Sequence, residues 1–181
     1  MKKQLKKFQI GVIGYAGPEE YPSNNAPKKS IYKIAEDVGF FIAQKGAVVV
    51  TGGKSGVMEF ATRGAKKAGG ITIGVVKGKK RFTSNKFTDI EFITGMESDG
   101  MDEIFIVNMC DAFIVIGGGA GTLQEISVAY RNKKPIIIIK DTGGWADKIN
   151  SNYLDERKTV NIQIALNAKD AIRKAFDSIK I

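Results

Sequence analysis

The chain has 181 residues, of which 43% are hydrophobic and 9% aromatic, with 21 glycines and 4 prolines. This composition excludes a disordered or collagen-like chain, and the length suits one globular domain, residues 1–181, that folds without a disulfide or a metal. The net charge is +9 and histidine is absent. The charge favours anionic partners or a solvated lysine-rich surface, and the missing histidine removes the commonest metal ligand, so no metal site is expected.

Short runs rich in Val and Ile alternate along the chain with amphipathic segments. The runs, which predict strands, occupy residues 8–13, 47–50, 71–76, 90–93, 112–116 and 136–139. The amphipathic segments, which predict helices, occupy residues 30–44, 57–68, 101–109, 123–131, 145–158 and 168–179. Ser30 is the expected cap of the first helix. Continuous apolar runs are typical of parallel strands covered on both faces, so the pattern predicts a Rossmann-like fold, a doubly wound three-layer α/β/α sandwich with a mainly parallel sheet.

Other segments bear on the compartment of the protein. The basic start of the chain leads into a short, glycine-broken apolar stretch, which favours a strand over a signal peptide. No run of eighteen apolar residues predicts a membrane span. Cys110 is the single cysteine and lies in an apolar run, where a buried hydrophobe is favoured over a nucleophile. A cytoplasmic location and no membrane partner are therefore expected.

Three predicted strand ends carry glycines. They are Gly14; the turn with Gly52, Gly53, Lys54, Ser55 and Gly56; and the turn with Gly117, Gly118, Gly119, Gly121 and Thr122. At such turns backbone N–H groups approach an anion closely, and a helix N-terminus adds positive partial charge. None of the turns spells a dinucleotide fingerprint or a P-loop, and turn geometry explains each one alone. Together, at one edge of a parallel sheet, they predict a phosphate-binding site.

Two of these turns carry a family resemblance. Residues 117–125, GGGAGTLQE, resemble the PGGxGTxxE motif of the LOG (Lonely Guy) phosphoribohydrolases and the GGxGTxxE motif of the molybdenum cofactor carrier proteins. Residues 52–58, GGKSGVM, are similar to the second glycine turn of both groups. The resemblance spans residues 10–139 and implies a bound nucleotide or molybdenum cofactor and a homodimer or higher homo-oligomer. Residues 116–117 read Ile-Gly where LOG enzymes open the motif with proline, which favours the carrier-like branch.

One departure from the family bears on catalysis. Both branches place an arginine nine residues before the aspartate that opens the motif strand; here that aspartate is Asp111, and the arginine position is Asp102, followed by Glu103. Two carboxylates repel a phosphate, where an arginine would bind it. The resemblance implies a catalytic role for Glu125 if the protein is an enzyme, and the missing arginine argues against hydrolysis.

Other residues of the turns have two readings. Thr122 suits either a phosphate contact or a helix N-cap, and Glu125, three residues on, suits a capping box.

The positive charge that the missing arginine would supply can come from lysines and an arginine near the strand ends. These are Lys54, which is the preferred one because it sits in a glycine turn, and Lys77, Lys79, Lys80 and Arg81.

Three functions compete. The first is a carrier-like protein that binds a nucleotide-like small molecule through the glycine turns. The second is a nucleoside 5'-monophosphate phosphoribohydrolase, with Glu125 at the ribose. The third is nucleic-acid binding, prompted by the charge and by distantly related Rossmann-like DNA-processing proteins; without a recognition motif a nucleic-acid partner is not expected. The lysine decarboxylase label that the family carries is rejected, because no lysine with an acidic partner is arranged for a pyridoxal cofactor.

Overall fold

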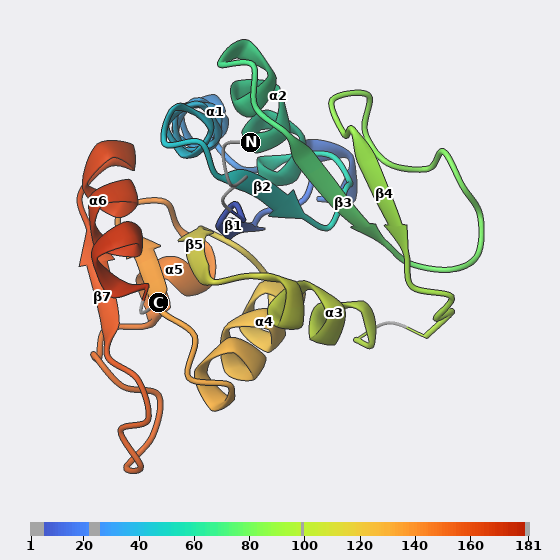
Figure 1. The fold of residues 1–181 in the computed structure, drawn as a ribbon. Coiled ribbons are helices and arrows are strands. Elements are labelled where there is room, and N and C mark those ends of the chain that lie inside the picture. The colour runs from blue at the N-terminus through green and yellow to red at the C-terminus, as the bar shows by residue number, and fades with distance from the viewer. Residues whose placement is uncertain (1–5, 22–25, 99, 180–181) are drawn as a thin grey trace.

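The computed structural model describes residues 6–21, 26–98 and 100–179 (Figure 1). Within them, seven parallel strands form one sheet in the order β4-β3-β2-β1-β5-β6-β7. The strands are β1 (Gln9–Gly14), β2 (Val48–Thr51), β3 (Thr72–Val76), β4 (Ile90–Ile93), β5 (Ala112–Ile116), β6 (Ile136–Ile139) and β7 (Ile162–Ala165). The chain starts in the middle of the sheet, runs to one edge and returns to β5 beside β1, so the predicted doubly wound fold is confirmed.

Helices cover both faces of the sheet (Figure 1). They are α1 (Lys29–Gln44), α2 (Val57–Lys67), α3 (Asp102–Met109), α4 (Ala120–Arg131), α5 (Gly144–Lys148) and α6 (Ala168–Ser178), with a 3-10 turn η1 (Pro18–Glu20) after β1. One core lies between the sheet and α1, α2 and α6, and the other between the sheet and α3, α4 and α5. Every residue of β5 and β6 is buried, as continuous apolar runs predict.

Some predicted elements differ from the structure. Helix α1 begins at Lys29 after Lys28, so Ser30 lies inside the helix and is not its cap. The helix predicted over residues 145–158 ends at Lys148, and the strand β7 follows it where no strand was predicted. Residues 150–152, Asn-Ser-Asn, favour turn conformations, which ends the helix early.

Helix α2, which follows the second glycine turn, is fixed by close packing on α1. A Cβ atom at Gly39 would collide with the carbonyl oxygen of Ala61, and one at Gly64 would collide with that of Glu36. The buried Glu36 carboxylate accepts hydrogen bonds from Arg63, at 2.5 Å, and from Lys67. These contacts hold the middle and end of α2 against α1.

Helix α3 is only partly covered. Ile106 and Val107 are buried, whereas Met101, just before the helix, and Ile104 are 40% and 44% exposed. Residues 104–107, Ile-Phe-Ile-Val, put apolar side chains on nearly every side of the helix, which suits burial in the core or at a subunit contact. Homo-oligomerisation stays a prediction.

No helix in the described part of the chain is long and apolar enough to cross a membrane. The predicted cytoplasmic location is not tested by this finding.

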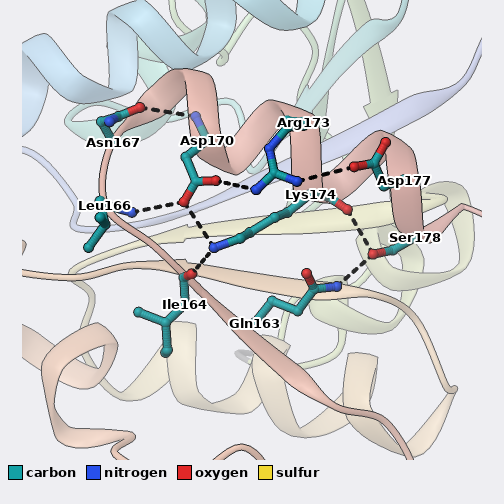
Figure 2. Close-up of polar contacts among 9 residues, drawn as sticks. All are labelled: Gln163, Ile164, Leu166, Asn167, Asp170, Arg173, Lys174, Asp177 and Ser178. Carbon is teal, nitrogen blue, oxygen red and sulfur yellow. Dashed lines mark hydrogen bonds and ion pairs between the residues drawn. The ribbon is translucent and has the colours of Figure 1, made fainter.

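Helix α6 is held at the sheet edge by a polar network (Figure 2). The Asn167 side chain accepts a hydrogen bond from the Asp170 backbone N–H at 3.0 Å and so caps the helix. The Asp170 carboxylate accepts bonds from the backbone N–H of Leu166, from Arg173 and from Lys174. The bonds from Lys174 and Arg173 lower the pKa of Asp170 to about 2.

Replacing Asn167 by alanine is expected to lower the free energy of unfolding by about 1 kcal/mol, because the capped N–H group loses its acceptor. Urea unfolding at neutral pH measures the change. Asn167→Ser keeps a capping oxygen and should fall within a few tenths of a kcal/mol of the wild type. Equal losses in both variants would contradict the role of the cap.

Candidate functional site

A pocket of about 260 Å³ opens at the carboxyl edge of the sheet, where the three glycine-bearing strand ends meet. Its wall is built from the end of β1, η1, the turn before α2, and helices α3 and α4. The lining residues are Ile13, Gly14, Ala16, Glu20, Tyr21, Gly52, Lys54, Met58, Asp102, Glu103, Ile106, Gly119, Ala120, Gly121, Thr122 and Glu125. The pocket lies beside the topological switch between β1 and β5, where doubly wound sheets bind ligands.

The first two glycines of the third turn serve the fold and do not line the pocket. Gly117 and Gly118 have φ values of 63° and 100°, which glycine adopts readily and other residues rarely do. A Cβ atom at Gly117 would collide with the Tyr15 ring, and one at Gly118 would lie 2.5 Å from Thr122. The backbone N–H of Gly117 donates to Thr142 at 2.9 Å. Both glycines are therefore required by packing against the segments beside them.

The other two glycines of this turn lie at the pocket and have no such requirement. A Cβ atom at Gly119 would meet nothing within 4 Å, and one at Gly121 would meet only Glu103, at 3.9 Å. Neither residue has a positive φ value. Because α4 begins at Ala120, the N–H groups of its first turn lie at this wall, with the positive end of the helix dipole. Glycine here keeps the helix N-terminus open to the pocket.

The second glycine turn is divided in a similar way. Gly52 and Lys54 line the pocket, whereas Gly53 and Gly56 have φ values of 71° and 72° and are buried. A Cβ atom at Gly56 would collide with the chain at Ala16. The Ser55 hydroxyl donates to Glu19, a bond that lowers the pKa of that carboxyl.

Gly14 and Thr122 join the two halves of the site. Gly14 lines the pocket, and a Cβ atom there would collide with the carbonyl oxygen of Ile116 on β5. The Thr122 hydroxyl donates to the carbonyl oxygen of Gly14 at 3.2 Å. Since the N-cap of α4 is Gly119, Thr122 is the third residue of the helix, so the N-cap and capping-box readings of Thr122 and Glu125 are wrong.

Three carboxyl groups, which we call the acidic wall, line the pocket side by side on α3 and α4. Asp102 and Glu103 lie in the first turn of α3, where negative charge suits the helix dipole, and Glu125 projects from α4. Burial raises the pKa of Glu125 to about 8, and the neighbouring Glu103 and Asp102 add to the effect. At neutral pH Glu125 therefore keeps its proton and can donate a hydrogen bond.

The lining cation among the described residues is Lys54. Lys77, Lys79, Lys80 and Arg81 lie on the loop after β3 and do not line the pocket, although the sequence suggested them as alternatives. Glu20 and Tyr21 do line it and were not among the predicted site residues. In the sequence, only their place in the irregular segment after the first predicted strand could have marked Glu20 and Tyr21 as residues of the site.

No group of three or more Cys, Asp or Glu side chains in the described ranges is arranged to hold a metal ion. Cys110 is buried, and burial raises the pKa of its thiol well above the ordinary value. A protonated, buried thiol is a poor nucleophile, in agreement with the hydrophobic role expected for it.

These features define a Rossmann-like α/β protein with a glycine-lined pocket at the carboxyl edge of its sheet. The chain belongs to the SLOG cluster4 family, whose model matches residues 7–172. The predicted membership of the LOG and molybdenum cofactor carrier superfamily is confirmed by this match and by the following similarities.

Solved structures and a sequence relative resemble the whole chain. The molybdenum cofactor binding protein of Rippkaea orientalis is 30% identical, with a TM-score of 0.81 over 98% of this chain and 100% of that one. The molybdenum cofactor carrier protein of Chlamydomonas reinhardtii is 31% identical, with a TM-score of 0.76 over 95% and 98%. A cytokinin riboside 5'-monophosphate phosphoribohydrolase of Mycobacterium tuberculosis is 28% identical over 94% of this chain and 98% of its own.

Proposed function

We propose that the pocket binds a small nucleotide-like molecule, a nucleotide or a nucleotide-bearing cofactor, with a phosphate at the N-terminus of α4. The observation that carries this proposal is the pair Gly119 and Gly121, which the fold does not require and which keep that N-terminus open. The uncapped N–H groups and the helix dipole attract a phosphate, and Lys54 adds a full positive charge.

The wall that α3 forms beside this N-terminus suits hydrogen-bond donors. The carboxylates of Asp102 and Glu103 accept hydrogen bonds and repel a second phosphate, so the part of the ligand that faces them is the part without a phosphate. Purine and pterin rings carry N–H donors on their edges. The names of two relatives include a nucleoside monophosphate and the molybdenum cofactor. Each of these molecules combines a phosphate with such a ring.

The test is a comparison of each nucleoside 5'-monophosphate with the nucleoside that lacks the phosphate, by isothermal titration calorimetry. We expect the monophosphate to bind at least about tenfold more tightly, because charge-assisted hydrogen bonds contribute about 1.5–3 kcal/mol. Lys54→Ala is expected to weaken the monophosphate about tenfold and the nucleoside hardly at all. Lys169→Ala, an exposed change on α6, is the matched control. Equal affinities for both ligand forms would contradict the proposal.

A second candidate function is hydrolysis of the N-glycosidic bond of a nucleoside monophosphate. The protonated Glu125 favours it, because a departing base needs a proton, and a carboxyl with a pKa of about 8 holds one at neutral pH. Asp102 argues against it, because the arginine of the hydrolases is missing there. Release of free base, followed by chromatography and abolished by Glu125→Ala, would establish the enzyme. Binding without base release would leave the carrier-like function.

A further inference from the structure

The segment between β3 and β4, residues 77–89, extends beyond the edge of the sheet as a wide loop (Figure 1). It contains five basic residues, one acidic residue and two phenylalanines. Its exposed basic and aromatic side chains, which we call the basic loop, are Lys79, Lys80, Arg81, Phe82 and Lys86. None of them lines the pocket, so the basic loop needs its own explanation.

The middle of this loop is held by the edge strand β4. The Glu91 carboxylate on β4 accepts backbone N–H bonds from Phe82 at 2.6 Å, Thr83 at 2.9 Å and Ser84 at 2.8 Å. It also accepts the Ser84 hydroxyl at 2.7 Å. These bonds lower the pKa of Glu91 to about 2, so the clamp persists across the ordinary pH range. The loop is therefore pre-organised and does not have to be ordered by a partner.

A second anchor joins the loop to the glycine turn before α2. The Asn85 backbone N–H donates to the carbonyl oxygen of Gly53 at 2.6 Å, and its side-chain amide donates to that of Lys54 at 3.0 Å. The Asn85 side-chain oxygen accepts from the hydroxyl of Thr62 on α2 at 3.0 Å. Lys54 and Lys86 line one shallow hollow between the turn and the loop. Glu20 and Glu59 line the same hollow, so the excess of positive charge is confined to the basic loop.

Phe82 stands at the exposed end of the clamp. The residue is 85% exposed, and its backbone has a φ value of 60°, a left-handed conformation that is strained for a residue other than glycine. The Arg81 guanidinium lies 5.0 Å from the centre of the ring. The fold holds an aromatic face in solvent beside a cation, although burying the ring would be favourable. This arrangement favours a ligand that stacks.

We propose that the basic loop binds single-stranded nucleic acid, with a base stacked on Phe82 and neighbouring phosphates against the surrounding cations. A single strand presents unpaired base faces and, at short spacing between them, negatively charged phosphates. The bases match the Phe82 ring, and the phosphates match the cations around it. A duplex hides its base faces, so it offers phosphates but nothing for Phe82. The sequence argued against nucleic acid because no recognition motif is present, but a basic loop with an exposed ring needs no such motif.

The test is fluorescence anisotropy with a labelled deoxythymidine oligomer of about 20 nucleotides, titrated at several salt concentrations. The triple variant Lys79→Ala/Lys80→Ala/Arg81→Ala is expected to reduce the slope of log K against log salt by about 2, since each lost phosphate contact removes about 0.7. Phe82→Ala is expected to weaken binding about tenfold with the slope unchanged, and Phe82→Trp to retain binding.

The matched control removes three exposed cations elsewhere, Lys45→Ala/Lys158→Ala/Lys169→Ala, and leaves the same net charge as the loop variant. Control and loop variants that weaken binding equally would overturn the proposal, because general charge would then explain it. So would an unchanged affinity in Phe82→Ala, an absence of binding by the wild type, or tighter binding to anionic lipid vesicles than to the oligomer. The pocket variants leave this loop intact, so this test and the nucleotide titration fail independently.

Discussion

Glu125→Gln is expected to remove a pH dependence from the stability of the protein. The carboxyl of Glu125 has a pKa of about 8 in the folded chain against an ordinary value of 4.5, so it binds a proton on folding between these values. A native state that holds more protons than the unfolded chain loses stability as pH rises through this window. The wild type should therefore weaken from pH 5 to pH 9, and the glutamine variant should not share that loss.

The size of the effect follows from the shift. One unit of pKa corresponds to about 1.4 kcal/mol, and with allowance for solvent near the pocket mouth the difference between the two proteins should change by at least about 2 kcal/mol from pH 5 to pH 9. The charged and titratable groups that face Glu125 across the pocket are Asp102 and Glu103 on α3, Glu20 and Tyr21 at η1, and Lys54 in the glycine turn. Burial makes the largest contribution to the raised pKa of Glu125, and the like charges of Glu103 and Asp102 add to it.

Urea unfolding at pH 5, 7 and 9 measures this change. Glu156→Gln, an exposed carboxylate on the loop after α5, is the matched control for losing one negative charge. Its stability should follow the wild type at each pH. If the curves of wild type and Glu125→Gln run parallel, Glu125 titrates as an ordinary carboxyl, and the second candidate function loses its proton donor.

The doubly wound parallel sheet and the two helical layers were predictable because the signals were strong. Six apolar runs of four to six residues alternate with helical segments, a pattern typical of a parallel sheet with helices on both faces. The edge strand β4 is less covered than the others, because Ile90 and Phe92 stay exposed. The strand β7 was missed because its burial neither alternates nor is continuous: Ile162 and Ala165 are buried, while Gln163 and Ile164 are only half-buried. An edge strand of four residues has too few positions to show a period.

The candidate site was predictable as a place but not residue by residue. Glycine turns at strand ends locate the pocket, but the sequence of a turn does not show which of its glycines are required by the fold. That depends on neighbours far along the chain, such as Tyr15 against Gly117 and Ala16 against Gly56. The α4 N-cap was misplaced for the same reason: Thr122 has the chemistry of a cap, but its hydroxyl bonds to Gly14 on another strand.

The glycines at the pocket, unlike those that the fold requires, should accept alanine without a loss of stability but with a large loss of nucleotide affinity. Gly121→Ala should leave the free energy of unfolding unchanged or raise it by up to about 1 kcal/mol, because alanine suits a helix better and meets open space there. The same methyl group enters the pocket at the N-terminus of α4, so the affinity for a nucleoside monophosphate should fall about tenfold or more. Gly119→Ala should act in the same direction on binding.

Gly118→Ala is the contrast that makes this result interpretable. Its φ value of 100° and the 2.5 Å approach to Thr122 mean that alanine strains the backbone and displaces the start of α4. The variant should lose about 2–3 kcal/mol of stability in urea. If Gly121→Ala were equally unstable, the glycines at the pocket would serve the fold. If it were stable and bound nucleotide normally, the phosphate would lie elsewhere. Weakened binding in a fully stable protein assigns those glycines to the ligand.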